Sequence, residues 1–140
     1  MEKKIFVFFI FMISLFADSI GIVKNFHGYV EIKRGEKIIP VKKGLSVKEG
    51  DLILTKASSG VGIVFEDGSL LSLGEKSIFS VKRYLFKPQK SEYDIDLKLN
   101  RGKAAFSSGK VGKLVPASLK FRVPEGMVGI RGTKFLVSVK

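Results

Sequence analysis

The chain has 140 residues, among them 25 Lys and Arg, 13 Asp and Glu, one His and no Cys or Trp. This length predicts one domain. The lack of Cys excludes disulfides, zinc thiolate sites and thiol catalysis, and the single histidine, His27, excludes any site that needs two imidazole groups. The formal net charge of +12 raises the question of whether the protein binds nucleic acid or an anionic surface.

The first 17 residues have the layout of a secretory signal peptide, so we expect two parts, 1–17 and 18–140. Two lysines form a positively charged start, and the apolar run at 5–16 is shorter than the roughly 20 residues of a membrane-spanning helix. The small Ala17 precedes Asp18, and we expect cleavage between these two residues. The alternative is that the segment is kept as an N-terminal anchor. We therefore expect an exported domain, in the periplasm or at the cell surface.

Apolar residues alternate with other residues through most of the remaining chain. Because successive side chains of a strand point to opposite faces, each alternating run predicts a strand with one buried side. No stretch keeps a helical period, and 15 glycines argue against long helices, so we expect at most one helical turn, near 88–91. The pattern predicts an all-β fold: a compact single domain of short, mostly antiparallel strands in a β-sandwich or β-roll. The clearest runs are 29–33, 61–66, 93–99, 119–123 and 135–139.

Glycine-containing turns separate these runs. The Asp67-Gly68 step between two alternating runs is the strongest β-hairpin signal, because such turns need a residue that tolerates positive φ. The polar, proline-containing segment 86–92 predicts a long surface loop. Three further turns are expected at residues 34–36, 100–102 and 107–109.

Three turn-containing motifs follow one another along the chain in a distinctive order. They are G-D-L-I-L-T at 50–55, F-E-D-G-S-L-L-S-L at 65–73 and V-G-I-R-G-T-K-F at 128–135. This succession resembles the FecR domain family, whose pattern is a "GD-x-I-x-T" segment, an "F-x-DGS-x-L-x-L" hairpin and a closing "IGVRGTxF" segment. Val128 and Ile130 replace the usual Ile and Val of the closing segment.

The resemblance covers residues 20–139 and implies an all-β, extracytoplasmic binding or sensing module. In the regulators that give the family its name, this domain follows an anti-sigma segment and a transmembrane helix, and it relays the state of an outer-membrane transporter to a sigma factor. The sequence given shows neither of those segments. We therefore expect this protein to share the binding or sensing module of those regulators rather than their whole signalling circuit. A role in a sigma/anti-sigma circuit stays as a further alternative.

Most motif positions are expected to be structural, because glycine supplies positive φ and Asp or Thr can bond the turn backbone. Arg131 is the exception, since a guanidinium group between two glycines could clamp a carboxylate or phosphate of a partner. The alternative for Arg131 is an internal ion pair with a turn aspartate such as Asp67 or Asp51. The expected structural positions are Gly50, Asp51, Asp67, Gly68, Gly129, Gly132 and Thr133.

Candidate catalytic and metal sites are weak. The S-x-x-K match at 107–110 lacks the S-D-N and K-T-G motifs that accompany it in penicillin-binding enzymes, so we expect a solvated turn there. Asp94 and Asp96 share one strand face, which is too few carboxylates for a calcium site and typical of a solvent-facing side. His27 is expected at the surface. We therefore predict no catalytic, cofactor-binding or metal-binding residue, no cofactor and no enzymatic activity.

The basic residues are scattered along the chain rather than gathered in one run, and few aromatic residues lie between them. This pattern is not typical of nucleic-acid binding, so we expect no nucleic-acid partner. The main hypothesis is a non-enzymatic extracytoplasmic module that recognises a protein or cell-envelope partner. The alternative is a basic structural or surface-associating envelope protein with weak contacts to anionic membrane or glycan. Neither the partner's identity nor the oligomeric state follows from the sequence.

Overall fold

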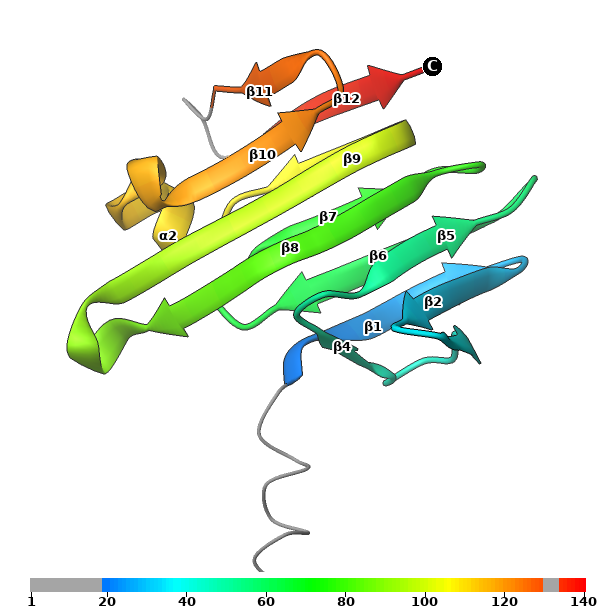
Figure 1. Cartoon of the computed structure of the whole chain (residues 1–140), viewed down its shortest axis with the longest axis horizontal. Coiled ribbons are helices and arrows are strands. Elements are labelled where there is room, and N and C mark those ends of the chain that lie inside the picture. The colour runs from blue at the N-terminus through cyan, green and yellow to red at the C-terminus, as the bar shows by residue number, and fades with distance from the viewer. Residues whose placement is uncertain (1–18, 130–133) are drawn as a thin grey trace, which may run out of the picture.

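This computed structural model describes residues 19–129 and 134–140, which form twelve strands and three short helical segments (Figure 1). The helical segments are the 3₁₀ turns η1 (Pro88–Lys90) and η2 (Pro116–Ser118) and the helix α2 (Lys110–Leu114). The strands are β1 (Ser19–His27), β2 (Val30–Arg34), β3 (Lys37–Pro40), β4 (Ser46–Lys48), β5 (Leu52–Thr55), β6 (Gly60–Phe65), β7 (Leu70–Leu73), β8 (Ile78–Lys87), β9 (Glu92–Ser107), β10 (Leu119–Val123), β11 (Gly126–Val128) and β12 (Lys134–Val139).

The strands form one curled sheet that doubles back into two layers. The first layer has the order β3-β2-β5-β8-β9-β10-β11, and the second has the order β4-β1-β6-β7-β9-β12. The long strand β9 belongs to both layers, because its first part pairs with β8 and β10 and its last part pairs with β7 and β12. Every pair is antiparallel except β9 with β10. The expected all-β, mostly antiparallel fold is confirmed.

A single apolar core fills the space between the layers. The alternating runs place their apolar residues inward, so that Ile32, Phe79 and Phe121 of the first layer have no exposed surface. Aromatic rings bridge the two layers: Phe65 stacks on Tyr84 at 5.3 Å between ring centroids, and Phe106 packs on Phe121 at 5.5 Å. Burial of the aliphatic and aromatic side chains of this core is the main contribution to its stability.

Strand β9 changes layers at Gly102. Its φ of +101° is a left-handed conformation that other residues rarely adopt, and a Cβ atom here would lie 2.5 Å from the Cα of Ser77. The predicted turn at 100–102 is therefore wrong, because the chain bends within a continuous strand instead of reversing. Sequence alone could not separate these outcomes, since both use the same glycine conformation.

Three further expectations need correction. The described residues contain α2 and η2 besides the turn near 88–91, so the expectation of at most one helical turn is wrong. The segment 86–92 is not a long loop: β8 runs to Lys87, β9 begins at Glu92, and the expected helical turn η1 connects them. The segment 107–110 is not a solvated turn, since Ser108 and Gly109 are buried and α2 begins at Lys110. A Cβ atom on Gly109 would lie 2.5 Å from the backbone nitrogen of Ser69, so a distant turn covers this segment.

Candidate interaction surface

The aspartate of the Gly50-Asp51 motif is bound within the domain. Gly50 has a φ of +90°, and the Asp51 carboxylate is buried. Arg34 donates from Nε to Oδ1 at 2.9 Å and from Nη2 to Oδ2 at 2.8 Å, and the backbone nitrogen of Lys48 donates to Oδ2 at 2.8 Å. The hydrogen bond to Asp51 raises the pKa of Arg34. This bidentate ion pair ties the end of β2 to the turn before β5.

The aspartate of the hairpin motif is also buried, but its hydrogen-bond donors are neutral. The Tyr84 hydroxyl donates to Asp67 Oδ1 at 2.6 Å, the backbone nitrogen of Ser69 donates to Oδ1 at 3.0 Å, and that of Val111 donates to Oδ2 at 3.3 Å. Burial, with the hydrogen bond to Asp67, raises the pKa of Tyr84. Asp67 therefore connects the β6–β7 turn, strand β8 and helix α2.

The other residues singled out by sequence fall partly outside the described part of the chain. Ala17, Asp18, Arg131, Gly132 and Thr133 lie outside the described residues. His27 and Gly129 are described and exposed, His27 at the end of β1 and Gly129 after β11. Gly68, in the hairpin turn, has a φ of +88°.

The two aspartates of β9 each have an arginine partner. Arg83 donates to Asp94 at 2.9 Å, and Arg122 donates to Asp96 at 2.8 Å. Among residues 19–129 and 134–140, no group of three or more His, Asp or Glu side chains is placed to hold a metal ion. The outward side of the first part of β9 is thus a solvent-facing surface with ion pairs across strands.

A charge-poor surface lies on the outside of the second layer. The strands of the second layer contain four lysines but no Asp or Glu, if only the part of β9 that follows Arg101 is counted. One row of outward residues crosses paired strands from Ile22 through Val64 to Leu70, and Ile22 and Leu70 are 50% and 44% exposed. A neighbouring row runs Gly62, Ser72, Ala105 and Leu136. We call the outward residues of these two rows the apolar outer face.

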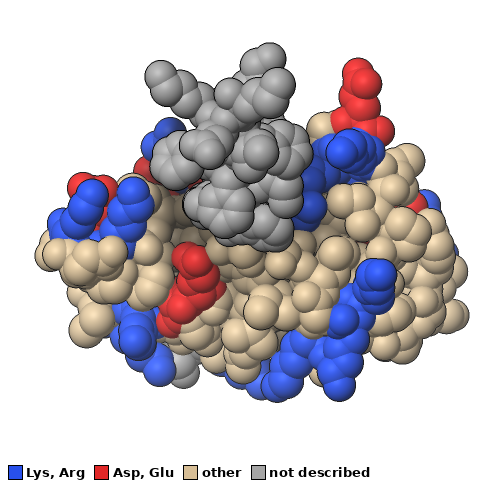
Figure 2. Space-filling model, turned by 90° about the horizontal axis from the view of Figure 1, so that it is seen from below, with Lys and Arg blue, Asp and Glu red and all other residues tan. Residues whose placement is uncertain are grey.

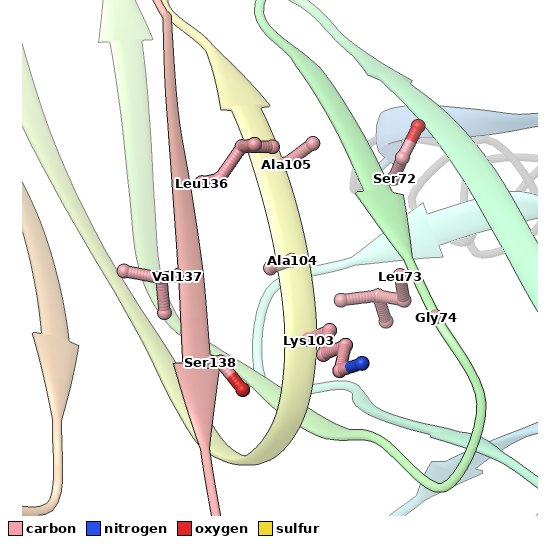
Figure 3. A pocket seen from close by; sticks show the side chains of 9 residues that line it. All are labelled: Ser72, Leu73, Gly74, Lys103, Ala104, Ala105, Leu136, Val137 and Ser138. Carbon is pink, nitrogen blue, oxygen red and sulfur yellow. The ribbon is translucent and has the colours of Figure 1, made fainter.

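A shallow groove of about 420 Å³ crosses β7, β9 and β12 on the apolar outer face (Figure 3). Ser72, Gly74 and Ala105 are small, and Leu136 lies beside Ala105 with 77% of its surface exposed. Small side chains next to an exposed leucine leave both backbone and apolar surface open to contact. Large exposed apolar surfaces on soluble domains are typical of interaction sites.

The outer side of the first layer differs from the apolar outer face because it carries a cluster of basic side chains. A pocket of about 240 Å³ at its outer side is lined by three cationic side chains, those of Lys56, Lys76 and Arg101. Lys56 lies 3.7 Å from Glu31, and Lys76 has a left-handed φ of +52°. We call this the cationic pocket. On the face shown in Figure 2, the basic side chains form several separate groups with uncharged surface between them.

Sequence reasoning missed both surfaces. Alternation indicates which residues point outward from a strand, but it does not indicate which strands are neighbours. Ile22, Leu70 and Leu136 become one surface only through pairing of β1, β6, β7, β9 and β12. The available signal was the lack of acidic residues in the segments that form the second layer.

Comparison with known proteins identifies the family. No curated protein and no solved structure matches the chain. No helix among the described residues has the length and apolar character required to cross a membrane. Members of the FecR family are regulatory proteins linked to signalling in sigma/anti-sigma circuits. The FecR family is not a known enzyme family. The family model described as "FecR protein" matches residues 51–140, and the chain therefore belongs to the FecR family.

Proposed function

We propose that this domain is a non-enzymatic, extracytoplasmic binding or sensing module, and that it recognises a protein partner of the cell envelope through the apolar outer face. The observation that carries the proposal is the row Ile22, Val64 and Leu70 beside the groove at Leu136. Apolar surface at the centre of a patch supplies most of the binding free energy in protein interfaces.

The charges around this face indicate the kind of partner. All four charged residues in the strands of the second layer are lysines, including Lys103 at the groove and Lys134 at the start of β12. A surface with an apolar centre and a basic rim complements a partner with an apolar centre and an acidic rim. Membership in the FecR family supports a role in signalling, and the sigma/anti-sigma circuit remains a narrower form of this proposal.

Site-specific photo-crosslinking in cells tests this proposal. A benzoylphenylalanine in place of Ser72 lies on the apolar outer face, and the same residue in place of Ser80 lies on the outer side of the first layer. We expect a discrete adduct from position 72 and none from position 80. Adducts only from position 80, or none from either position, would contradict the proposal.

A second candidate function is electrostatic association with anionic envelope surfaces, and the cationic pocket favours it. Lys56, Lys76 and Arg101 are exposed and surround one small concavity, which suits a phosphate or sulfate group. Binding of the protein to anionic vesicles should then fall steeply between low and physiological salt, and the triple change of these residues to Ala should abolish it. Salt-independent vesicle binding would exclude this candidate.

A further inference from the structure

The sandwich has four edge strands among the described residues, and three of them are protected against pairing with another chain. In the first layer, β3 carries Pro40 and an exposed Lys37, and β11 has only three residues. In the second layer, β4 also has three residues. Short strands, lysines and prolines are the usual features that prevent edge-to-edge association.

The fourth edge, β12, lacks these features over most of its length. It has six residues without Pro or Gly, and within the described part of the chain it pairs only with β9. Its sole charged residue is Lys134, at the start. Its outward side presents Leu136, which is the most exposed large apolar residue described, at 77%. A six-residue strand with one open side is a template for another strand.

We propose that two copies of this protein pair antiparallel through β12, so that their second layers join into one continuous sheet. The strand can pair with itself in a register that places no like charges opposite each other. Lys134, Leu136 and Ser138 are exposed, and the alternate residues Phe135 and Val137 are half-buried toward the core. Both cores must lie on the same side of the joined sheet. This requires the twofold axis to pass between two copies of the same residue, so that this residue lies directly opposite itself in the second protein.

An axis at Leu136 places Leu136 opposite Leu136 of the second copy and Lys134 opposite Ser138. An axis at Val137 would instead place Lys134 opposite Lys140, and like charges directly opposite each other are destabilising. The Leu136 register therefore buries the exposed leucine pair without opposing lysines. Figure 3 shows Leu136 and Val137 on opposite sides of β12, as this pairing requires.

The dimer extends the apolar outer face across the axis. The row Gly62, Ser72, Ala105 and Leu136 would continue into the same row of the second copy, and the grooves beside the two β12 strands would meet. Dimerisation does not depend on the proposed partner, because it involves the edge of β12 rather than a protein bound on the face.

Sedimentation of the purified protein over a wide concentration range tests the inference. We expect a concentration-dependent dimer for the wild type. Leu136→Lys and Leu136→Glu should each raise the dimer dissociation constant at least about tenfold, because like charges then meet at the axis. An equimolar mixture of the two variants should dimerise again, since Lys then faces Glu. Leu114→Lys, at the last residue of α2 and 73% exposed, is the matched control and should leave the dimer unchanged.

Three results would overturn the inference. They are a wild type that stays monomeric at every concentration, a dimer that Leu136→Lys leaves intact, and a mixture of the two charged variants that does not associate. Because Leu136 is exposed, neither variant should change the circular dichroism spectrum, which excludes misfolding as the cause of dissociation.

Discussion

The outer faces of the two layers belong to one domain and share one core, yet they differ in charge. The outer side of the first layer carries ion pairs across strands, Arg83 with Asp94 and Arg122 with Asp96, together with the cationic pocket. The strands of the second layer contain no acidic residue, and their outward positions are apolar or small around Leu70 and Leu136.

This difference indicates which face interacts. Exposed ion pairs contribute little to stability but keep a surface solvated, which suits a face that stays in water. Exposed apolar residues in adjacent rows gain nothing from solvent, and their burial against a partner is favourable. The outer face of the second layer is therefore the better suited to contact, although the first layer also exposes single apolar residues such as Ile38 and Met127.

The largest expected effect comes from Gly102, where β9 passes from one layer to the other. Gly102→Ala should destabilise the fold by about 3 kcal/mol or more, since it adds strain at a φ of +101° and a clash with Ser77. Urea unfolding measures this change. Gly35→Ala is the control: its φ is +62° but nothing lies within 4 Å, so the cost should be only about 1 kcal/mol. Equal effects from both variants would show that the layer crossing imposes no special constraint.

The next effect concerns Asp67, which supports the hairpin that carries Leu70. Asp67→Ala leaves the Tyr84 hydroxyl and the backbone nitrogens of Ser69 and Val111 without their acceptor, so we expect a loss of about 3 kcal/mol. Hydrogen exchange should show increased opening at β6, β7 and α2 before the strands of the first layer. Uniform opening of both layers would mean that the network does not support the second layer selectively.

Tyr84 adds a pH dependence to the same network. Its pKa is raised above the ordinary value of 10.0 in the folded state, so the unfolded chain loses this proton first. The contribution of Tyr84 is therefore complete below about pH 10 and decreases as the pH rises further. Tyr84→Phe should lower the free energy of unfolding by about 1 kcal/mol at neutral pH, and the difference from wild type should shrink above pH 10. A constant difference would contradict this account.

The smallest effects belong to the ion pairs of the first layer. Arg122→Ala should cost at most about 1 kcal/mol, because the side chains of Arg122 and Asp96 are 42% and 23% exposed. Arg83→Ala should produce no measurable change in stability, since Arg83 and Asp94 are more exposed. Thermal unfolding at low and high salt measures both. A large loss in either variant would mean that this face has a structural role that solvent exposure does not suggest.

The strands and the main hairpin could be predicted from sequence. Alternation located the buried residues of β6 and of the first part of β9, and the turn at Asp67-Gly68 joins β6 to β7 as expected. These features depend on local periodicity and on glycine conformation. A sequence carries both directly.

Features that depend on contacts between distant segments could not be predicted. The passage of β9 between layers depends on Ser77 packing against Gly102, and the burial of Gly109 depends on the hairpin turn at Ser69. The apolar outer face is likewise a product of strand order. Local patterns fix which side of a strand is outward, whereas long-range pairing decides what surface those sides form together.

Retention of envelope proteins on the immobilised domain tests the central claim most directly. Leu70→Lys changes the apolar outer face, and Leu52→Lys makes the same change on the outer side of the first layer. We predict that a partner is retained at low and physiological salt by the wild type and by Leu52→Lys, and that Leu70→Lys weakens retention at least about tenfold. Retention that survives Leu70→Lys, or that depends on Leu52, would contradict the claim that the apolar outer face binds the partner.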